Sequence, residues 1–462
     1  MLLSARFQVV LLKMLFLDSA PNRSHLIALL RLCLLNASWG AATLAVILGD
    51  ISRPLTNIGV VAFALFVLMT LPQLRRDSLI ILGMLGIISL FLFDGLPNKG
   101  ALLQGGASVL IFAALLPTMA LVRATATTMP SVQQTQRQLT QLPAKESAGG
   151  LQIAGHVFGG IINTGAFAML SAALPRNSSQ AQRQIAAEAA IRGMVSSAAW
   201  SPFFVAFAIG QNFVEPIYAW GAIGIGIATA ILFSLVTLFG LNRQFTFRQL
   251  VASLLCLRPV AIRLSVVLIM VLGVALLFDL TALSAVVTAM PMLVLMQMAR
   301  YPQKVKTILA ETRSAMDQIG DDVVIITSAM FVAYFAMQSA AMQQFVNAVY
   351  PGDIPGWFAL IATPVLMMVA SVVGIHPVIT SSALLTVFGG GGADVHPALL
   401  VQSHLIGWGA GTMSSVASLS VISCASLYRV PARRLALGPN LIVGFVYALL
   451  GGCLLSALEV FL

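Results

Sequence analysis

The sequence predicts an all-α polytopic membrane protein with about 11 transmembrane helices plus two opposed re-entrant hairpins in an inverted-topology repeat. The first observation is composition: of 462 residues, 59% are hydrophobic and only 9% are charged, whereas soluble domains carry about 25% charged residues. The second is that runs of roughly 20 apolar residues recur from end to end, each long enough to cross about 30 Å of hydrocarbon. The third is the distribution of Lys and Arg between these runs, which fixes their direction.

The formal net charge of +10 has a simple explanation in such a protein, because the cytoplasmic loops of membrane proteins are rich in Lys and Arg. It therefore gives no reason to expect nucleic acid as a partner. The cysteines are scattered without CxxC spacing, so neither a metal site nor a disulfide framework is indicated. They are Cys33, Cys256, Cys424 and Cys453.

Residues 1–25 imitate a signal peptide, but Lys13 interrupts the apolar core and no convincing cleavage site follows. We interpret them as an N-terminal interfacial amphipathic segment, followed by an extra transmembrane helix at 26–48. Further spans are expected at 57–73, 78–94, 103–122, 187–210, 216–241, 262–280, 282–299, 323–346, 397–428 and 436–461. The polar connectors at 127–149 and 300–322 are each expected to form a short helix along the inner surface.

Two apolar stretches, 149–175 and 356–390, are rich in Gly and small polar residues near their middles. If the N-terminus is cytoplasmic and both stretches fold as hairpins, nearly all Lys and Arg lie on the inner side, and the outer loops keep only Arg53 and Lys99. Counting either stretch as a full crossing would reverse every later span and destroy this pattern. We therefore expect two re-entrant hairpins, one from each face, and a C-terminus outside.

This assignment makes the chain an inverted repeat, with the first copy at 57–241 and the second at 262–461. Each copy has three spans, a hairpin and two more spans, and an odd number of crossings separates the copies. The helix after each hairpin is expected to be broken, at 187–210 by Pro202 and at 397–428 by a Gly-rich polar run. Inverted repeats with broken helices at matching places indicate a secondary transporter whose site lies near the membrane midplane.

The candidate substrate or ion site consists of polar residues at the hairpin tips and the helix breaks. Hydroxyls and amides there would replace water around a solute, and helix N-termini that point inward favour anionic groups. The first tip contributes Asn163, Thr164 and Gly165, and the second contributes His376, Thr380, Ser381 and Ser382. The broken helices contribute Ser197, Ser201, Pro202, Thr412, Ser414 and Ser415. Small and hydroxylated residues also pack membrane helices together, so a packing role stays open for these residues.

Ionisable residues in the hairpins and broken helices are expensive in a membrane and are functional candidates by default. His156, His376 and His404 are candidates for carrying a coupled proton, and the alternative for each is a hydrogen-bonded interior side chain. Glu188 and Arg192 lie four residues apart on one helical face and are expected to pair. We interpret this pair as structural.

The predicted arrangement of opposed hairpins and broken helices resembles the ion transporter superfamily, including the divalent anion/sodium symporters. In that family the hairpin tips carry a Ser-Asn-Thr signature. Asn163 and Thr164 match its last two positions after Ile162, and the second tip reads Thr-Ser-Ser at 380–382 without the Asn. The resemblance implies an elevator movement of the hairpin domain against a scaffold, sodium as the coupling ion, and a homodimer.

We therefore expect a secondary active transporter of the inner (cytoplasmic) membrane that moves a small organic anion, carboxylate-like, coupled to a proton or sodium gradient. Its partners would be the substrate and the bilayer; neither a cofactor nor enzymatic activity is expected, and no Gly-rich ATP-binding loop is present. One alternative is a cation/proton antiporter or metalloid exporter of the same fold, with Glu188 as the titrating carboxylate. Another is a membrane-embedded enzyme or lipid-linked carrier protein, which the few, dispersed acids disfavour. A structural assembly component would leave the hairpin symmetry unexplained.

Overall fold

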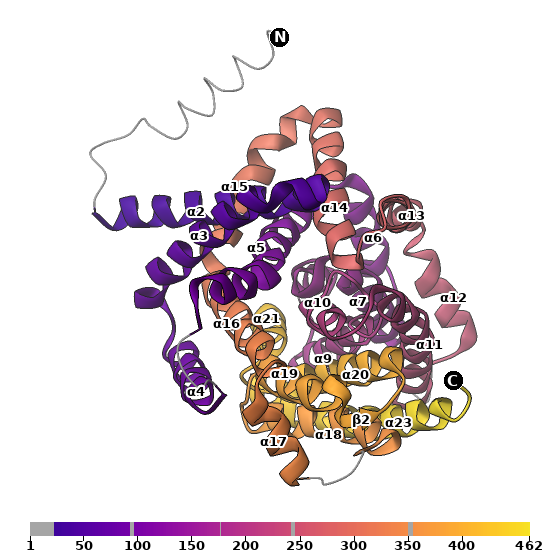
Figure 1. Ribbon diagram of the computed structural model, residues 1–462. Coiled ribbons are helices and arrows are strands. Elements are labelled where there is room, and N and C mark those ends of the chain that lie inside the picture. The colour runs from indigo at the N-terminus through magenta and orange to yellow at the C-terminus, as the bar shows by residue number, and fades with distance from the viewer. Residues whose placement is uncertain (1–22, 93–96, 176, 242–244, 350–353) are drawn as a thin grey trace.

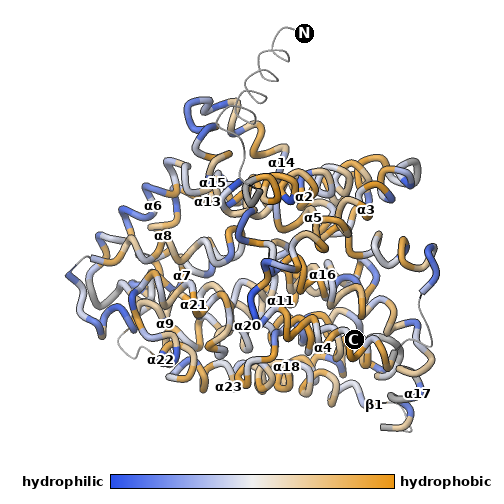
Figure 2. Tube along the Cα trace, turned by 90° about the vertical axis from the view of Figure 1, so that its left-hand side faces the viewer, coloured by the Kyte–Doolittle hydropathy of each residue, from blue (hydrophilic) through white to orange (hydrophobic). Residues whose placement is uncertain are grey.

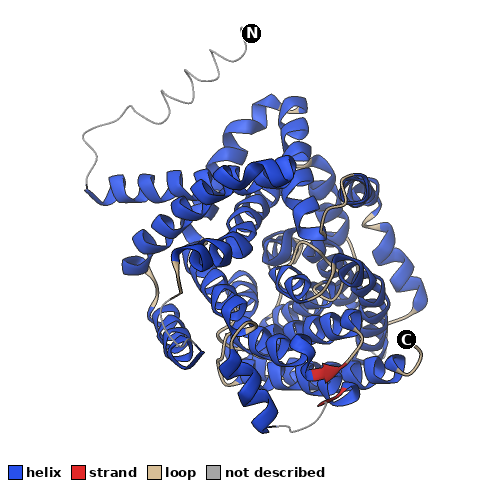
Figure 3. Cartoon of the chain, viewed as in Figure 1, coloured by secondary structure: helices blue, strands red, loops and turns tan. Residues whose placement is uncertain are grey.

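The computed structural model describes residues 23–92, 97–175, 177–241, 245–349 and 354–462. Within these ranges the chain is almost entirely helical (Figure 3), and the strands β1 (Ile354–Pro355) and β2 (Ala393–Asp394) form a short parallel pair. The interfacial segment expected at 1–25 lies outside the described residues except for its end, where the first helix begins at Arg23.

The helices follow one another closely along the chain. The first part forms α2 (Arg23–Leu48), α3 (Arg53–Thr70), α4 (Arg76–Leu92), α5 (Lys99–Thr127), α6 (Pro130–Thr140), α7 (Ala144–Ile162), α8 (Ala166–Ala172), α9 (Gln180–Ser197), α10 (Val205–Gly210) and α11 (Pro216–Leu241). The second part forms α12 (Phe247–Leu255), α13 (Arg258–Leu277), α14 (Ala282–Arg300), α15 (Val305–Gln318), α16 (Gly320–Ala336), α17 (Ala340–Val349), α18 (Gly356–Val372), α19 (Pro377–Val387), α20 (Pro397–Ser414), α21 (Leu419–Tyr428), α22 (Ala432–Leu437) and α23 (Pro439–Glu459).

Many of these helices suit a membrane. In the described part of the chain, eight are long and apolar enough to cross one, or up to ten if each of two bent pairs counts as one span. Large apolar side chains stay exposed on them, for example Ile58 on α3, Val236 on α11 and Ile269 on α13. Hydrophobic residues dominate most helices, whereas hydrophilic ones gather at connectors such as α6 (Figure 2). Because so much exposed apolar surface needs hydrocarbon around it, the chain is a helical, multi-pass membrane protein.

Several predicted spans coincide with helices, most closely 216–241 with α11. The connector helices expected within 127–149 and 300–322 are confirmed as α6 and α15. The single span expected at 323–346 is wrong, because α16 ends at Ala336 and α17 begins at Ala340. The hydroxyl of Ser339 accepts a hydrogen bond from the amide of Met342 at 3.5 Å, so a new helix starts where the apolar run was expected to continue.

Two groups of helices make up most of the molecule (Figure 1). The peripheral group consists of α2, α3, α5, α14, α15 and α16, which pack around α5. The hairpin group consists of α7–α11 and α18–α23. α16 packs on α5 of its own group and on α19 of the hairpin group, and α5 also contacts α7. The boundary between the two groups therefore runs along α5 and α16.

The hairpin group contains two pairs of parallel helices. Along α7 and α9, Gly155 faces Ala190 and, further on, Gly159 faces Met194. Along α18 and α20, Gly407 faces Pro364 and Gly411 faces Ser371 in the same way. Because the paired helices run in the same direction, the chain between them must turn back. The returning segments contain α8 and α19, and the reversals lie at 163–165 and 373–376, which we call tip one and tip two.

Gly226→Ala is expected to lower the free energy of unfolding by about 1–3 kcal/mol. A Cβ atom there would overlap the backbone carbonyl oxygen of Ala199, between α9 and α10. Gly224→Ala is the matched control, because nothing lies within 4 Å of a Cβ at that position of the same helix. Thermal unfolding of the purified variants measures the difference, and equal midpoints would contradict the close contact between α11 and the chain at Ala199.

Candidate functional site

The broken helices predicted by the sequence pack against each other within the hairpin group. The first is α9 and α10, separated by residues 198–204, and the second is α20 and α21, separated by residues 415–418 and bent by 42°. We call these separating segments break one and break two. A Cβ on Gly409 would lie 3.0 Å from the carbonyl oxygen of Val195, and the two breaks lie on either side of this contact.

Contacts at both ends show that the broken helices run antiparallel. The Sγ atom of Cys424 on α21 donates to the carbonyl oxygen of Ala187 on α9 at 3.5 Å. At the other end, Nε2 of His404 on α20 lies 2.8 Å from the carbonyl oxygen of Ala206 on α10. Residue numbers rise along one broken helix as they fall along the other.

Tip one carries unpaired polar side chains. Asn163 ends α7 with a φ of 49°, a backbone conformation that Asn tolerates better than most residues. Asn163, Thr164 and Gly165 are half-buried, and no described residue forms a hydrogen bond with the side chain of Asn163 or Thr164. An amide and a hydroxyl without protein partners are costly in an apolar surrounding, so these groups are available to water, an ion or a substrate.

Tip two lies earlier in the chain than the sequence indicated. Gly374, with a φ of +93°, makes the reversal, and His376 caps α19 because its Nδ1 accepts from the amide of Val378 at 3.2 Å. The predicted Thr380, Ser381 and Ser382 lie in the following helical turns instead.

The three hydroxyl residues after tip two have protein partners. Thr380 donates to the carbonyl oxygen of Pro377 at 3.3 Å, and buried Ser382 contacts the sulfur of Met330 on α16 at 3.7 Å. The buried Oγ of Ser381 lies 2.9 Å from Nδ1 of His404. Of the four residues predicted for tip two, only His376 lies at the reversal, and the other three lie within α19.

Break one is buried and its hydroxyls are engaged. Ser197 donates to the carbonyl oxygen of Met194 at 2.6 Å. Ser201 donates to the carbonyl oxygen of Gly160 on α7 and accepts from the amide of Phe203 at 3.2 Å. Pro202 lies next to it and is also buried. These residues hold α7 against break one, which agrees with the packing alternative for Ser197 and Ser201.

Break two is more open than break one. Val416 and Leu419 are 38% and 49% exposed, and α21, which starts at this break, contacts tip one. Thr412 donates to the carbonyl oxygen of Trp408 at 2.8 Å, and Ser415 ends α20. The buried Oγ of Ser414 has no hydrogen-bond partner in the described structure and faces Gly444 of α23.

His156 has a complete set of partners as a neutral ring. Trp200 donates from Nε1 to Nε2 of His156 at 3.3 Å, so Nε2 carries no proton. The hydroxyl of Ser196 donates to the carbonyl oxygen of Gly193 at 2.7 Å and therefore accepts from Nδ1 of His156 at 2.8 Å. A second proton on this ring would displace Trp200.

His404 is held in the other neutral tautomer. A carbonyl oxygen only accepts, so Nε2 of His404 donates to Ala206, and Nδ1 is left to accept from the hydroxyl of Ser381. His376 differs from both rings: Nδ1 is occupied by the helix cap, and no described residue bonds to Nε2. Of these three rings, His376 is the one with a free nitrogen.

The expected pair of Glu188 and Arg192 is confirmed. Nη2 of Arg192 lies 3.3 Å from Oε2 of Glu188, and both side chains are about nine-tenths buried. Gln184 donates to the second carboxylate oxygen of Glu188 at 2.8 Å, and Nε of Arg192 donates to Asn440 of α23 at 2.7 Å. Both oxygens of Glu188 therefore already have partners.

Arg123 belongs beside this site, although the sequence placed it among the inner basic residues that follow the span at 103–122. α5 continues to Thr127, so Arg123 lies within the helix and is half-buried. A Cβ on Gly165 of tip one would lie 2.8 Å from Cγ and Cδ of Arg123 and 2.9 Å from its Nε. An Arg after an apolar run looks like any other positive-inside charge, so the sequence holds no signal for this contact.

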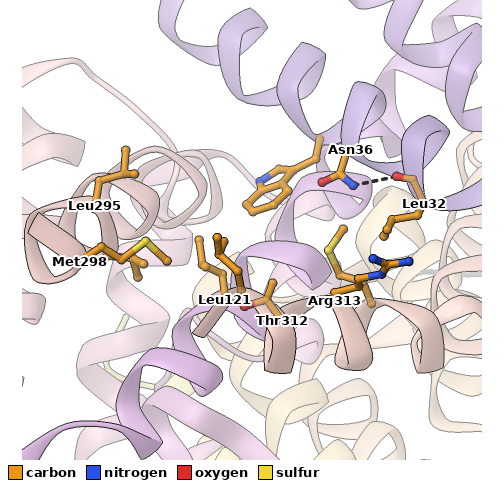
Figure 4. A pocket seen from close by; sticks show the side chains of 11 residues that line it. Leu32, Asn36, Leu121, Leu295, Met298, Thr312 and Arg313 are labelled. Atoms are coloured by element: carbon orange, nitrogen blue, oxygen red, sulfur yellow. Dashed lines mark hydrogen bonds between the residues drawn. The ribbon is translucent and has the colours of Figure 1, made fainter. Parts of the chain in front are cut away.

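Two cavities lie away from these residues. One of about 250 Å³ is bounded by α2, α5, α14 and α15 (Figure 4), with Leu32, Leu121 and Met298 among its apolar residues and Arg313 at its edge. Another of about 150 Å³ lies near the ends of α6, α8 and α9. Neither is lined by a predicted site residue. Among the described residues, no three His, Cys, Asp or Glu side chains group as they would around a metal ion.

Comparison with known proteins gives no assignment: no protein-family model matches the chain, and no curated protein matches it.

Proposed function

We propose that this protein is a secondary active transporter of the inner (cytoplasmic) membrane that moves a small organic anion, driven by a proton or sodium gradient. The observation that carries the proposal is the contact of tip one with α21, the helix that begins at the end of break two, with Asn163 and Thr164 unpaired. Interrupted helices and unpaired polar groups at membrane depth are tolerated where they line a wet cavity. Tip one and break two would form part of the wall of that cavity.

The direction of the helices supports an inverted repeat. In each half, the helix before the reversal runs parallel to the first part of a broken helix, as α7 does to α9 and α18 does to α20. The broken helices of the two halves are antiparallel. The two hairpins would therefore enter the membrane from opposite faces, which is the arrangement of inverted-repeat transporters. The N-terminus would be cytoplasmic and the C-terminus outside.

The few acids of the hairpins and broken helices favour an anionic substrate over a cationic one. Across 147–172, 180–210, 356–392 and 397–428 the sequence has one acidic residue, Glu188, and its carboxylate is occupied by Arg192 and Gln184. A cation/proton antiporter needs a carboxylate that is free to exchange its partners. Transport would follow the elevator scheme, with the hairpin group moving against the peripheral group, in a homodimer.

Cysteine labelling tests the cavity. In a background without the four native cysteines, Thr164→Cys and Val416→Cys are expected to react with a membrane-impermeant thiol reagent from one side of sealed vesicles, and a proton or sodium gradient should change the rate. Ser197→Cys is the control, because Ser197 is fully buried. If positions 164 and 416 stay unreactive from both sides under every gradient, they are packing elements and the proposed site is wrong.

A further inference from the structure

Arg123 is a guanidinium without a protein partner at the boundary between the two helix groups. It belongs to α5 of the peripheral group, but its side chain lies against Gly165 at tip one of the hairpin group. Its Nε is buried and has no hydrogen-bond partner in the described structure. Leaving a buried charged donor unpaired costs more than leaving a neutral one unpaired, so the arrangement calls for an acceptor that the protein itself does not supply.

The acidic residues near Arg123 do not fill that role. Asp322 on α16 is close enough to attract Arg123 and Arg75 electrostatically, but it forms no ion pair with either. Asp321 is already bound, because Nε of Arg75 lies 2.6 Å from its carboxylate and Ser78 donates to the same oxygen at 2.8 Å. The N–H groups of Arg123 therefore have no carboxylate acceptor in the described structure, although the charge of Asp322 attracts them.

We propose that Arg123 is the substrate-binding cation of this protein, and that a carboxylate group binds between its guanidinium and the side chains of Asn163 and Thr164. The inference rests on the proposed function and adds the residue that recognises the charge. A planar guanidinium binds a carboxylate through two parallel hydrogen bonds, and the amide of Asn163 and hydroxyl of Thr164 supply further donors. The bound anion then bridges α5 and tip one.

Asp322 has a definite effect in this arrangement. Its negative charge repels an arriving carboxylate and competes with it for Arg123, which weakens binding. Removing that charge should therefore strengthen binding, whereas removing the charge of Arg123 should weaken it strongly. A purely structural arginine would not produce opposite effects from the two substitutions.

The test measures binding of acetate, succinate and citrate to the purified full chain by ligand-induced thermal stabilisation, with inorganic phosphate as a second anion. Arg123→Gln is expected to raise the Kd of the best carboxylate about 10- to 100-fold, the equivalent of one or two charged hydrogen bonds. Arg123→Lys should have a smaller effect and guards against misfolding. Asp322→Asn should lower the Kd several-fold. Arg313→Gln, at an exposed arginine on α15, is the matched control and should leave the Kd unchanged.

The outcomes separate this inference from the proposed function. If vesicles containing the wild-type protein accumulate a carboxylate and Arg123→Gln does so with an unchanged KM, the transporter stands and the role of Arg123 is wrong. If the wild type binds carboxylates through Arg123 but moves none, the site stands and the transporter is wrong. If phosphatidylglycerol alone stabilises the protein through Arg123, the ligand is a lipid phosphate and the carboxylate proposal is overturned.

Discussion

Arg192→Met is expected to lower the free energy of unfolding by about 3–5 kcal/mol, the cost of leaving one member of a buried ion pair alone. Glu188, about nine-tenths buried, would lose its cationic partner, and Asn440 would lose the donor at 2.7 Å that joins α9 to α23. The double variant Glu188→Gln/Arg192→Met removes both charges and should recover much of the loss. Thermal unfolding in detergent, with size-exclusion profiles, measures both variants.

The pair of Arg75 and Asp321 is a suitable comparison, because the Arg75 side chain is 63% exposed. Arg75→Met should cost less than about 1 kcal/mol, as exposed ion pairs do. If Arg192→Met and the double variant unfold at the same temperature, Glu188 and Arg192 are not coupled and the structural interpretation fails. Transport that survives in Glu188→Gln would also weaken the cation/proton antiporter, since Glu188 is the carboxylate that this alternative needs.

Sequence patterns predicted the helix ends and breaks that are set by a Pro, Gly or Asn at that position. The span at 216–241 is found unchanged as α11, and Pro202 lies within break one. The predicted first tip, from Asn163 to Gly165, coincides with the short turn between α7 and α8. In each case a Pro, Gly or Asn changes the backbone where it stands, so one sequence was enough to find the position.

The position of the second tip could not be predicted from its hydroxyl residues. The hydroxyl cluster at 380–382 suggested an exposed polar tip, but hydroxyls in a helix can bond to carbonyls of the preceding turn or to a neighbouring helix. Ser381 bonds across to His404, and Gly374 makes the turn with its positive φ. Pro377 at the first position of α19 was the better local signal. The contact of Arg123 with Gly165 depends on how α5 packs on tip one, and nothing in either segment alone indicates it.

Substitutions of two histidines should have different effects: at His404 on stability, and at His376 on the pH dependence of transport. His404→Phe is expected to lower the free energy of unfolding by about 2–5 kcal/mol, because each buried group left without a partner costs about 1–3 kcal/mol. The two groups are the carbonyl oxygen of Ala206 and the hydroxyl of Ser381. Thermal unfolding of the purified variant measures the loss. A midpoint equal to that of the wild type would contradict the hydrogen bonds that tie α20 to α10 and α19.

His376→Asn should leave the stability unchanged and alter the pH dependence of transport. Asparagine is a good helix N-cap and can replace Nδ1 of His376 as acceptor for the amide of Val378, so the unfolding midpoint should stay within about 1 °C of the wild type, the change expected for a few tenths of a kcal/mol. Asparagine does not titrate, whereas a histidine ring can bind a second proton. If His376 carries the coupling proton, carboxylate uptake by the wild type depends on pH and uptake by His376→Asn does not. If the pH profile of His376→Asn equals that of the wild type, another group carries the coupling proton. If uptake depends on the sodium gradient alone, no proton is coupled to transport.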